Sequence, residues 1–197
     1  MSPLLSRLAS RLAITSVAVA SAVACSHPVL QPDVACHVGA FHLANGEIVD
    51  FAPTSNAKGD LKSDALRWRT LDGRTAVVTR DAKGAWAGTV GWTAQRDSTP
   101  VAFGGCGDAL LHFGGIEGTR VEFDVQEATF ENAGAKLFGR LVLPKGVLLP
   151  AVLIEVHGSE KYSGVDFYSS QRLYPAAGVG VFVFDKRGTG RSTGKYT

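Results

Sequence analysis

Two dipeptides with a strong preference for tight turns limit what this chain can fold into. Asn45-Gly46 divides the segment FHLANGEIVDF, and Asp72-Gly73 divides LRWRTLDGRTAVVTRD. Both lie between runs in which apolar and polar residues alternate. Such pairs favour the turns of β-hairpins, because glycine readily adopts the positive φ angles that these turns require. The sequence therefore predicts antiparallel strands on either side of each pair.

The run LRWRT shows the two faces that one of these strands should have. Side chains alternate along a strand, so Leu66 and Trp68 fall on one face while Arg67 and Arg69 fall on the other. Glycine is frequent in this part of the chain, and no long stretch has the period of a helix. We therefore expect residues 25–125 to form an N-terminal β-rich module that is mostly antiparallel.

The first 24 residues have the pattern of an export signal. Arg7 and Arg11 precede the uncharged run LAITSVAVASAVA, which ends in the cleavage motif Ala-Val-Ala. The run is shorter than the roughly 20 apolar residues that span a bilayer. We expect residues 1–24 to be removed and the protein to reach the periplasm or the cell envelope. Cys25 follows at once, and AVAC resembles a bacterial lipobox, so a lipid anchor at Cys25 and a plain cleaved signal both remain open.

Charge and cysteine content limit the partners. The chain has 20 Lys and Arg against 18 Asp and Glu, and it becomes formally neutral without the two arginines of the signal, which gives no electrostatic case for nucleic acid. Cys36 and Cys106 then remain, and two thiols of an exported protein usually pair. Two buried free thiols are the alternative. We expect no metal and no cofactor, since no Cys-x-x-Cys or His-x-x-x-His spacing occurs.

The pattern changes in residues 126–197. ATFENAGAKLFGRLVLP predicts two strands about the turn NAG, and residues 151–156 are apolar on both faces, as in a central parallel strand. VDFYSSQRLYPAAG predicts a helix that Pro175 kinks or shortens. Residues 179–185 predict a second buried strand. Together these elements form a strand–helix–strand unit with parallel strands, the start of an α/β domain.

Three motifs follow one another in this second half. LVLP ends one predicted strand, HGS begins at His157 after the next, and DKRGTGRS begins at Asp185 after the third. In this order they resemble the N-terminal part of a bacterial α/β-hydrolase domain of the exported serine aminopeptidase and dienelactone-hydrolase-like type. The resemblance implies an incomplete α/β-hydrolase-type sheet that starts with antiparallel strands. It also implies an exported esterase or peptidase that acts on a small acyl, ester or peptide substrate, with its Ser-His-Asp triad beyond this chain.

The resemblance assigns the oxyanion-hole loop to His157, Gly158 and Ser159. A backbone N–H in this loop stabilises the negative charge of the tetrahedral intermediate. An ordinary glycine turn with a packed histidine is the alternative. His157 is not expected to be the triad base, because the histidine of this fold follows the nucleophile along the chain.

The motif G-x-S-x-G occurs at Ser192 but lacks the setting of a nucleophile elbow. An elbow serine lies directly between a strand and a helix, and this one does not. Asp185, Arg187, Gly188 and Gly190 are instead expected to form a structural loop. In this loop Asp185 and Arg187 would pair with each other or with nearby backbone, and a solvated loop is the alternative.

A second hypothesis is a non-catalytic cell-envelope protein with a degenerate hydrolase remnant, whose β module binds a partner. Trp68, Trp86 and Trp92 could line a ligand groove, although such residues more often pack a small β core. His42 and His112 stand alone without partner spacing, and no role is expected for them.

Overall fold

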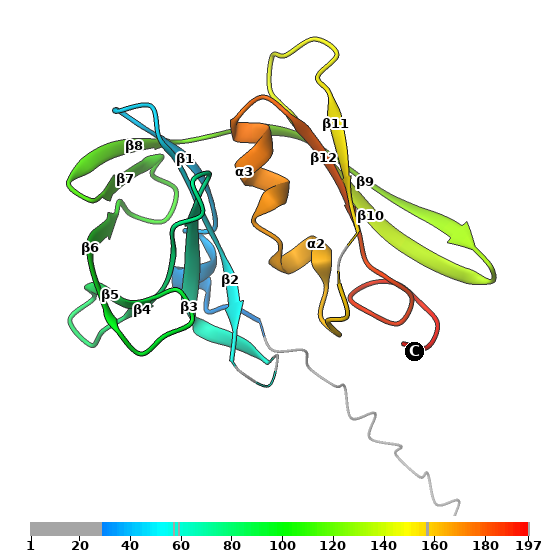
Figure 1. Ribbon diagram of the computed structural model, residues 1–197, viewed down its shortest axis with the longest axis horizontal. Coiled ribbons are helices and arrows are strands. Elements are labelled where there is room, and N and C mark those ends of the chain that lie inside the picture. The colour runs from blue at the N-terminus through cyan, green and yellow to red at the C-terminus, as the bar shows by residue number, and fades with distance from the viewer. Residues whose placement is uncertain (1–28, 57, 59, 157, 197) are drawn as a thin grey trace, which may run out of the picture.

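A closed barrel and a smaller sheet make up the protein (Figure 1). The computed structural model describes residues 29–56, 58, 60–156 and 158–196. The predicted export signal, the lipidation residue Cys25 and the predicted loop residue His157 lie outside the described residues. In the part of the chain that is described, no helix combines the length and the apolar character needed to cross a membrane.

Eight antiparallel strands follow one another around the barrel, and the last pairs with the first. They are β1 (Gly39–Leu43), β2 (Ile48–Ser55), β3 (Leu61–Thr70), β4 (Thr75–Arg80), β5 (Trp86–Val90), β6 (Arg96–Phe103), β7 (Leu110–Phe113) and β8 (Ile116–Arg120). The predicted hairpin turns are confirmed. Gly46 has a φ of 88° between β1 and β2, and Gly73 has a φ of 89° between β3 and β4.

Alternating side chains fill the barrel. Leu66 and Trp68 of β3 lie on one strand face, as predicted, and this face belongs to the barrel core together with aromatic and aliphatic residues of the other strands. The other face of β3 carries Arg67 and Arg69 outward, where Arg69 reaches Ser169 of the second half of the chain. One sequence pattern therefore supplies both the apolar core and a cationic outer wall.

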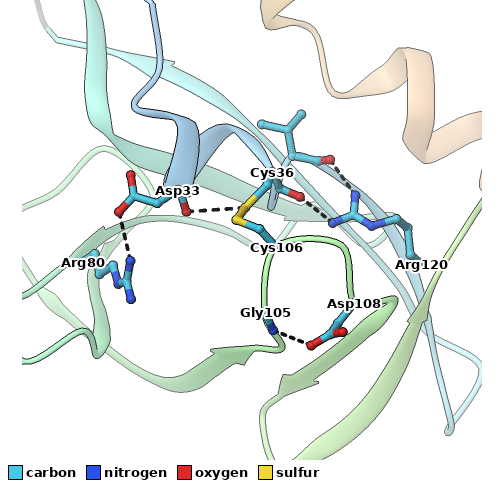
Figure 2. Close-up of a disulfide and its surroundings, with 8 residues drawn as sticks. Asp33, Cys36, Arg80, Gly105, Cys106, Asp108 and Arg120 are labelled. Carbon is cyan, nitrogen blue, oxygen red and sulfur yellow. Dashed lines mark hydrogen bonds and ion pairs between the residues drawn. A yellow bond between two sulfur atoms is a disulfide. The ribbon is translucent and has the colours of Figure 1, made fainter.

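A disulfide ties the N-terminal lead to the barrel (Figure 2). Cys36 caps helix α1 (Pro32–Ala35), and it is bonded to Cys106 in the loop between β6 and β7, 70 residues away. The Arg120 guanidinium donates hydrogen bonds to the carbonyl oxygens of Cys36 at 2.8 Å and of Val38 at 2.7 Å. In the chain-entropy model a bridge of this span stabilises the fold by about 4 kcal/mol.

The second sheet has four strands in the order β11-β12-β10-β9. They are β9 (Phe123–Asn132), β10 (Ala135–Pro144), β11 (Val152–Glu155) and β12 (Gly180–Phe184). β11 and β12 are parallel, and the other two pairs are antiparallel. The connection from β11 to β12 holds two short helices, α2 (Gly164–Phe167) and α3 (Ser170–Ala176), where the sequence predicted one. The chain is extended at Tyr168, which ends α2.

The expected α/β-hydrolase-type sheet, and with it the resemblance to that family, is wrong. Such a sheet consists mostly of parallel strands with helices on both faces. Here one strand pair is parallel, and the three described helices have four, four and seven residues. In Figure 1 the helices α2 and α3 cover one face of the small sheet. The motifs behind the resemblance are short strand ends and turns, which a mixed sheet also uses.

A buried ion pair fixes α3 against the barrel. Arg172 of α3 donates two hydrogen bonds to the carboxylate of Asp50 on β2 from one edge of its guanidinium, at 2.6 Å from Nε and 2.9 Å from Nη2. Asp50 is fully buried, and its burial raises the pKa of the carboxyl while the charge of Arg172 lowers it. His42 of β1 adds a hydrogen bond of 2.8 Å from its imidazole to the carbonyl oxygen of Ala176.

The opposite side of the same helix is fixed to the small sheet. Gln171 of α3 is buried, and its amide oxygen accepts a hydrogen bond of 3.1 Å from Arg140 on β10. Arg140 in turn pairs with Glu127 of β9 at 2.6 Å. The helix therefore lies between barrel and sheet and is bonded to both, an arrangement that Figure 1 shows.

The substitution Arg172→Met should destabilise the protein by about 3–5 kcal/mol, because it leaves the buried Asp50 carboxylate without its partner. Without Arg172, burial holds the folded-state pKa of Asp50 above its unfolded value. The loss relative to wild type should therefore be smaller at pH 4 than at pH 7, since protonation at low pH removes the buried charge. Urea unfolding at both pH values measures this.

Arg74→Met is the matched control. Arg74 pairs with Glu47 and Asp72, and its side chain is 50% exposed, so its loss should cost less than about 1 kcal/mol. Equal stability losses in the two variants would show that the buried pair does not fix α3.

Candidate functional site

A cleft opens between the outer wall of the barrel and the layer formed by α2 and α3. It encloses about 640 Å³, which lies within the range of small-molecule sites. The barrel contributes β2, β3, β4 and the turn after β5, and the other wall comes from the end of β11 and from residues 162–170. The site therefore depends on the docking of α3 on the barrel.

Two neighbouring arginines form the floor of this cleft. Arg67 donates a hydrogen bond of 2.7 Å to the carbonyl oxygen of Gly91, and its guanidinium lies 4.5 Å from the centre of the Trp92 ring. Arg69 donates one hydrogen bond of 3.3 Å to the Ser169 hydroxyl. Neither arginine takes part in an ion pair with another described residue. Burial and the nearby charge of Arg69 lower the pKa of Arg67 to about 10.

Aromatic side chains stand on both walls. Trp92 is 77% exposed on the barrel side. On the helical side Tyr162 packs on Phe167 with 4.8 Å between ring centres. Tyr168 also lines the cleft, and burial raises the pKa of its hydroxyl to about 12, so the hydroxyl stays protonated at neutral pH. The walls thus offer planar apolar surface beside the arginines.

One carboxyl group and three cationic side chains are among the residues that line the cleft. Glu155, at the end of β11, accepts a hydrogen bond from the Ser170 hydroxyl, and burial raises its pKa. Lys62, Arg67 and Arg69 line the same space. The cleft is therefore electropositive, which favours an anionic ligand.

The predicted oxyanion-hole loop lies at the edge of this region. His157 is outside the described residues, and Gly158 and Ser159 are exposed. The Gly158 N–H donates a hydrogen bond of 3.3 Å to the hydroxyl oxygen of Tyr168, which lines the cleft. The carbonyl oxygen of Ser159 accepts from the Tyr196 hydroxyl. The oxyanion role of these residues stays a prediction.

Hydrogen bonds to the buried carboxylate of Asp185 hold the loop that begins at this residue. Asp185 is fully buried, and its carboxylate accepts hydrogen bonds from the Ser163 hydroxyl at 2.7 Å and from the Arg191 N–H at 2.9 Å. Gly190 has a φ of 50°, and a Cβ there would lie 2.1 Å from an Asp185 carboxylate oxygen. Only glycine therefore fits beside this carboxylate.

The other predicted loop residues bond to backbone rather than to Asp185. Arg187 donates hydrogen bonds to the carbonyl oxygens of Asn132 at 3.1 Å, the last residue of β9, and of Ala133 at 3.0 Å, in the turn to β10. Gly188 has a φ of 72°, and a Cβ there would lie 2.2 Å from the Tyr196 nitrogen. These contacts join the loop to the sheet.

The hydroxyl of Ser192 is bonded to backbone groups on two sides. Its hydroxyl donates a hydrogen bond of 2.6 Å to the carbonyl oxygen of Asp185 and accepts one of 2.9 Å from the Phe138 N–H. The residue is buried, at 9% exposure. Both hydrogen bonds go to backbone, so the hydroxyl links the loop to β10 and is not presented as a nucleophile.

Of the three tryptophans, one lines the cleft. Trp68 lies in the barrel core, and Trp86 packs on Phe103 with 5.3 Å between ring centres. Trp92 faces the cleft. Sequence reasoning missed Arg67 and Arg69 as site residues, although their shared strand face was a signal for a cationic wall.

One group of three residues in the described chain brings metal-ligating atoms together. The donor atoms of Cys36, His37 and Cys106 lie within 4.8 Å of one another. Both sulfur atoms belong to the disulfide, so neither is available as a thiolate ligand. In this structure the two cysteines of the group form a covalent tie.

Comparisons with protein-family models, with curated proteins and with solved structures find no match for this chain.

Ser192→Ala should lower the free energy of unfolding by about 1–3 kcal/mol, because it leaves the Phe138 N–H and the Asp185 carbonyl without their partner. Urea denaturation measures this loss. Ser159→Ala is the control, since Ser159 is exposed, and it should change stability by less than about 0.5 kcal/mol. A Ser192→Ala protein as stable as wild type would contradict the structural role.

Proposed function

We propose that this protein binds a small organic ligand in the cleft between the barrel and α2–α3, without catalysing a reaction on it. One observation carries the proposal: Arg67 and Arg69, two partly desolvated arginines without an ion-pair partner in the described chain, line a cleft of about 640 Å³ beside the largely exposed ring of Trp92. A handful of charged groups among apolar surface is typical of a ligand site.

Location in the periplasm or cell envelope is part of the proposal. It is supported by the signal-like pattern of residues 1–24 and by the disulfide between Cys36 and Cys106, because disulfides persist in oxidising compartments. The serine-hydrolase prediction depended on a family resemblance that the fold contradicts. The backbone contacts of Ser192 also favour a binding role for the described part of the chain.

Binding can be tested with three small aromatic probes that differ in charge. Benzamide, benzylamine and benzoate are each titrated into the protein, and binding is followed by saturation-transfer NMR. At least one probe should bind, and Trp92→Ala should weaken it about fivefold, since an aromatic contact contributes about 1 kcal/mol.

Leu148→Ala is the matched control for this experiment. Leu148 is 90% exposed in the loop between β10 and β11, away from the residues that line the cleft. Its truncation should leave binding unchanged. If none of the three probes binds, or if Trp92→Ala binds as wild type does, the proposed function is wrong.

A further inference from the structure

We propose that the ligand of this cleft carries an acidic group, a carboxylate or a phosphate, that binds between Arg67 and Arg69. The inference rests on the proposed binding function and adds the chemical class of the ligand. Residues i and i+2 of a strand project from the same face, about 7 Å apart along the backbone. The two guanidinium groups therefore flank one position in the cleft.

Both arginines keep unused hydrogen-bond donors. A guanidinium group has five N–H donors. All the hydrogen bonds of Arg67 and of Arg69 to other described side chains and carbonyls come from Nη1. In both groups the edge formed by Nε and Nη2 has no hydrogen-bond partner in the described chain. This edge is the one that binds carboxylate and phosphate oxygens in a bidentate manner.

The positive charges of Arg67 and Arg69 are not balanced by a carboxylate bonded to either of them in the described chain. Asp50 lies close to Arg69, but both of its carboxylate oxygens are bonded to Arg172. Glu155 lines the cleft with its carboxylate engaged by Ser170. A buried or partly buried cation without a counter-charge is costly, and a bound anion relieves that cost. An acidic ligand fits this environment better than a neutral or basic one.

The guanidinium of Arg67 is also held in place before any ligand binds. Arg67 is 6% exposed, it is hydrogen bonded to the Gly91 carbonyl, and it lies against the Trp92 ring. A fixed donor loses little conformational entropy on binding. Trp92 itself is largely exposed beside it, so a planar group attached to the acid can lie on the indole. The expected ligand is a small acid with a planar body.

Isothermal titration calorimetry of the full chain with phenyl phosphate, benzoate and neutral benzamide tests the inference. The two acids should bind at least tenfold more tightly than benzamide, and their affinity should fall as NaCl is added. The ratio between phenyl phosphate and benzoate then distinguishes a phosphate ligand from a carboxylate ligand.

The variant Arg69→Gln should weaken phenyl phosphate and benzoate at least tenfold, the loss expected for a charge-assisted hydrogen bond, and should leave benzamide unchanged. Arg69→Lys keeps the charge but not the bidentate edge, so it should give an intermediate affinity. Arg74→Gln is the control, because Arg74 lies outside the cleft and pairs with Glu47 and Asp72. It should bind like wild type. Thermal unfolding confirms that each variant is folded.

The outcomes separate the two proposals. Benzamide binding as tightly as the acids would overturn the inference while leaving cleft binding in place. Acid binding that survives Arg69→Gln and also Arg67→Lys would overturn it as well, because the anion would then lie elsewhere. Binding of none of the three compounds would contradict both the inference and the proposed function.

Discussion

The ion pair between Asp50 and Arg172 is the interaction on which the arrangement of this protein depends. It joins β2 of the barrel to α3 through a carboxylate that is fully buried. The same helix is bonded to the small sheet through Gln171. Because α3 is held on both sides, residues 162–170 stand opposite β3, and the space left between them is the cleft. A buried pair of this kind contributes geometric specificity, since either partner alone would be an uncompensated charge.

Local patterns predicted the strands of the barrel but not its closure. The turns at Gly46 and Gly73 and the inward side chains of β3 follow from alternation and from the preference of glycine for positive φ angles. Closure depends on pairing of β1 with β8, where Phe41 faces Arg120 far along the chain. No local pattern encodes such a contact, so the sequence predicted a β module without its topology.

The second half shows how correct local signals led to a wrong family. The parallel pairing of β11 with β12 and the glycine turns after Asp185 are real features. The prediction of a central strand at residues 151–156 is wrong, because β11 lies at the edge of the sheet and its side chains are largely exposed. The step from these features to a hydrolase sheet depended on an analogy between short motifs. Such motifs occur in many folds and do not determine the sheet around them. The cleft was missed for a related reason. Arg69 and Ser169 meet across 100 residues of chain, and only the docking of α3 brings them together.

Hydrogen–deuterium exchange with and without phenyl phosphate tests the central claim, that the cleft between barrel and helical layer is the binding site. If phenyl phosphate binds there, exchange should slow in two separate stretches, β3 with the turn at residues 91–93 and the opposite wall at residues 162–170. Exchange in β9 and β10 should stay unchanged. Slowing confined to β9–β11, or to one wall of the cleft alone, would contradict it.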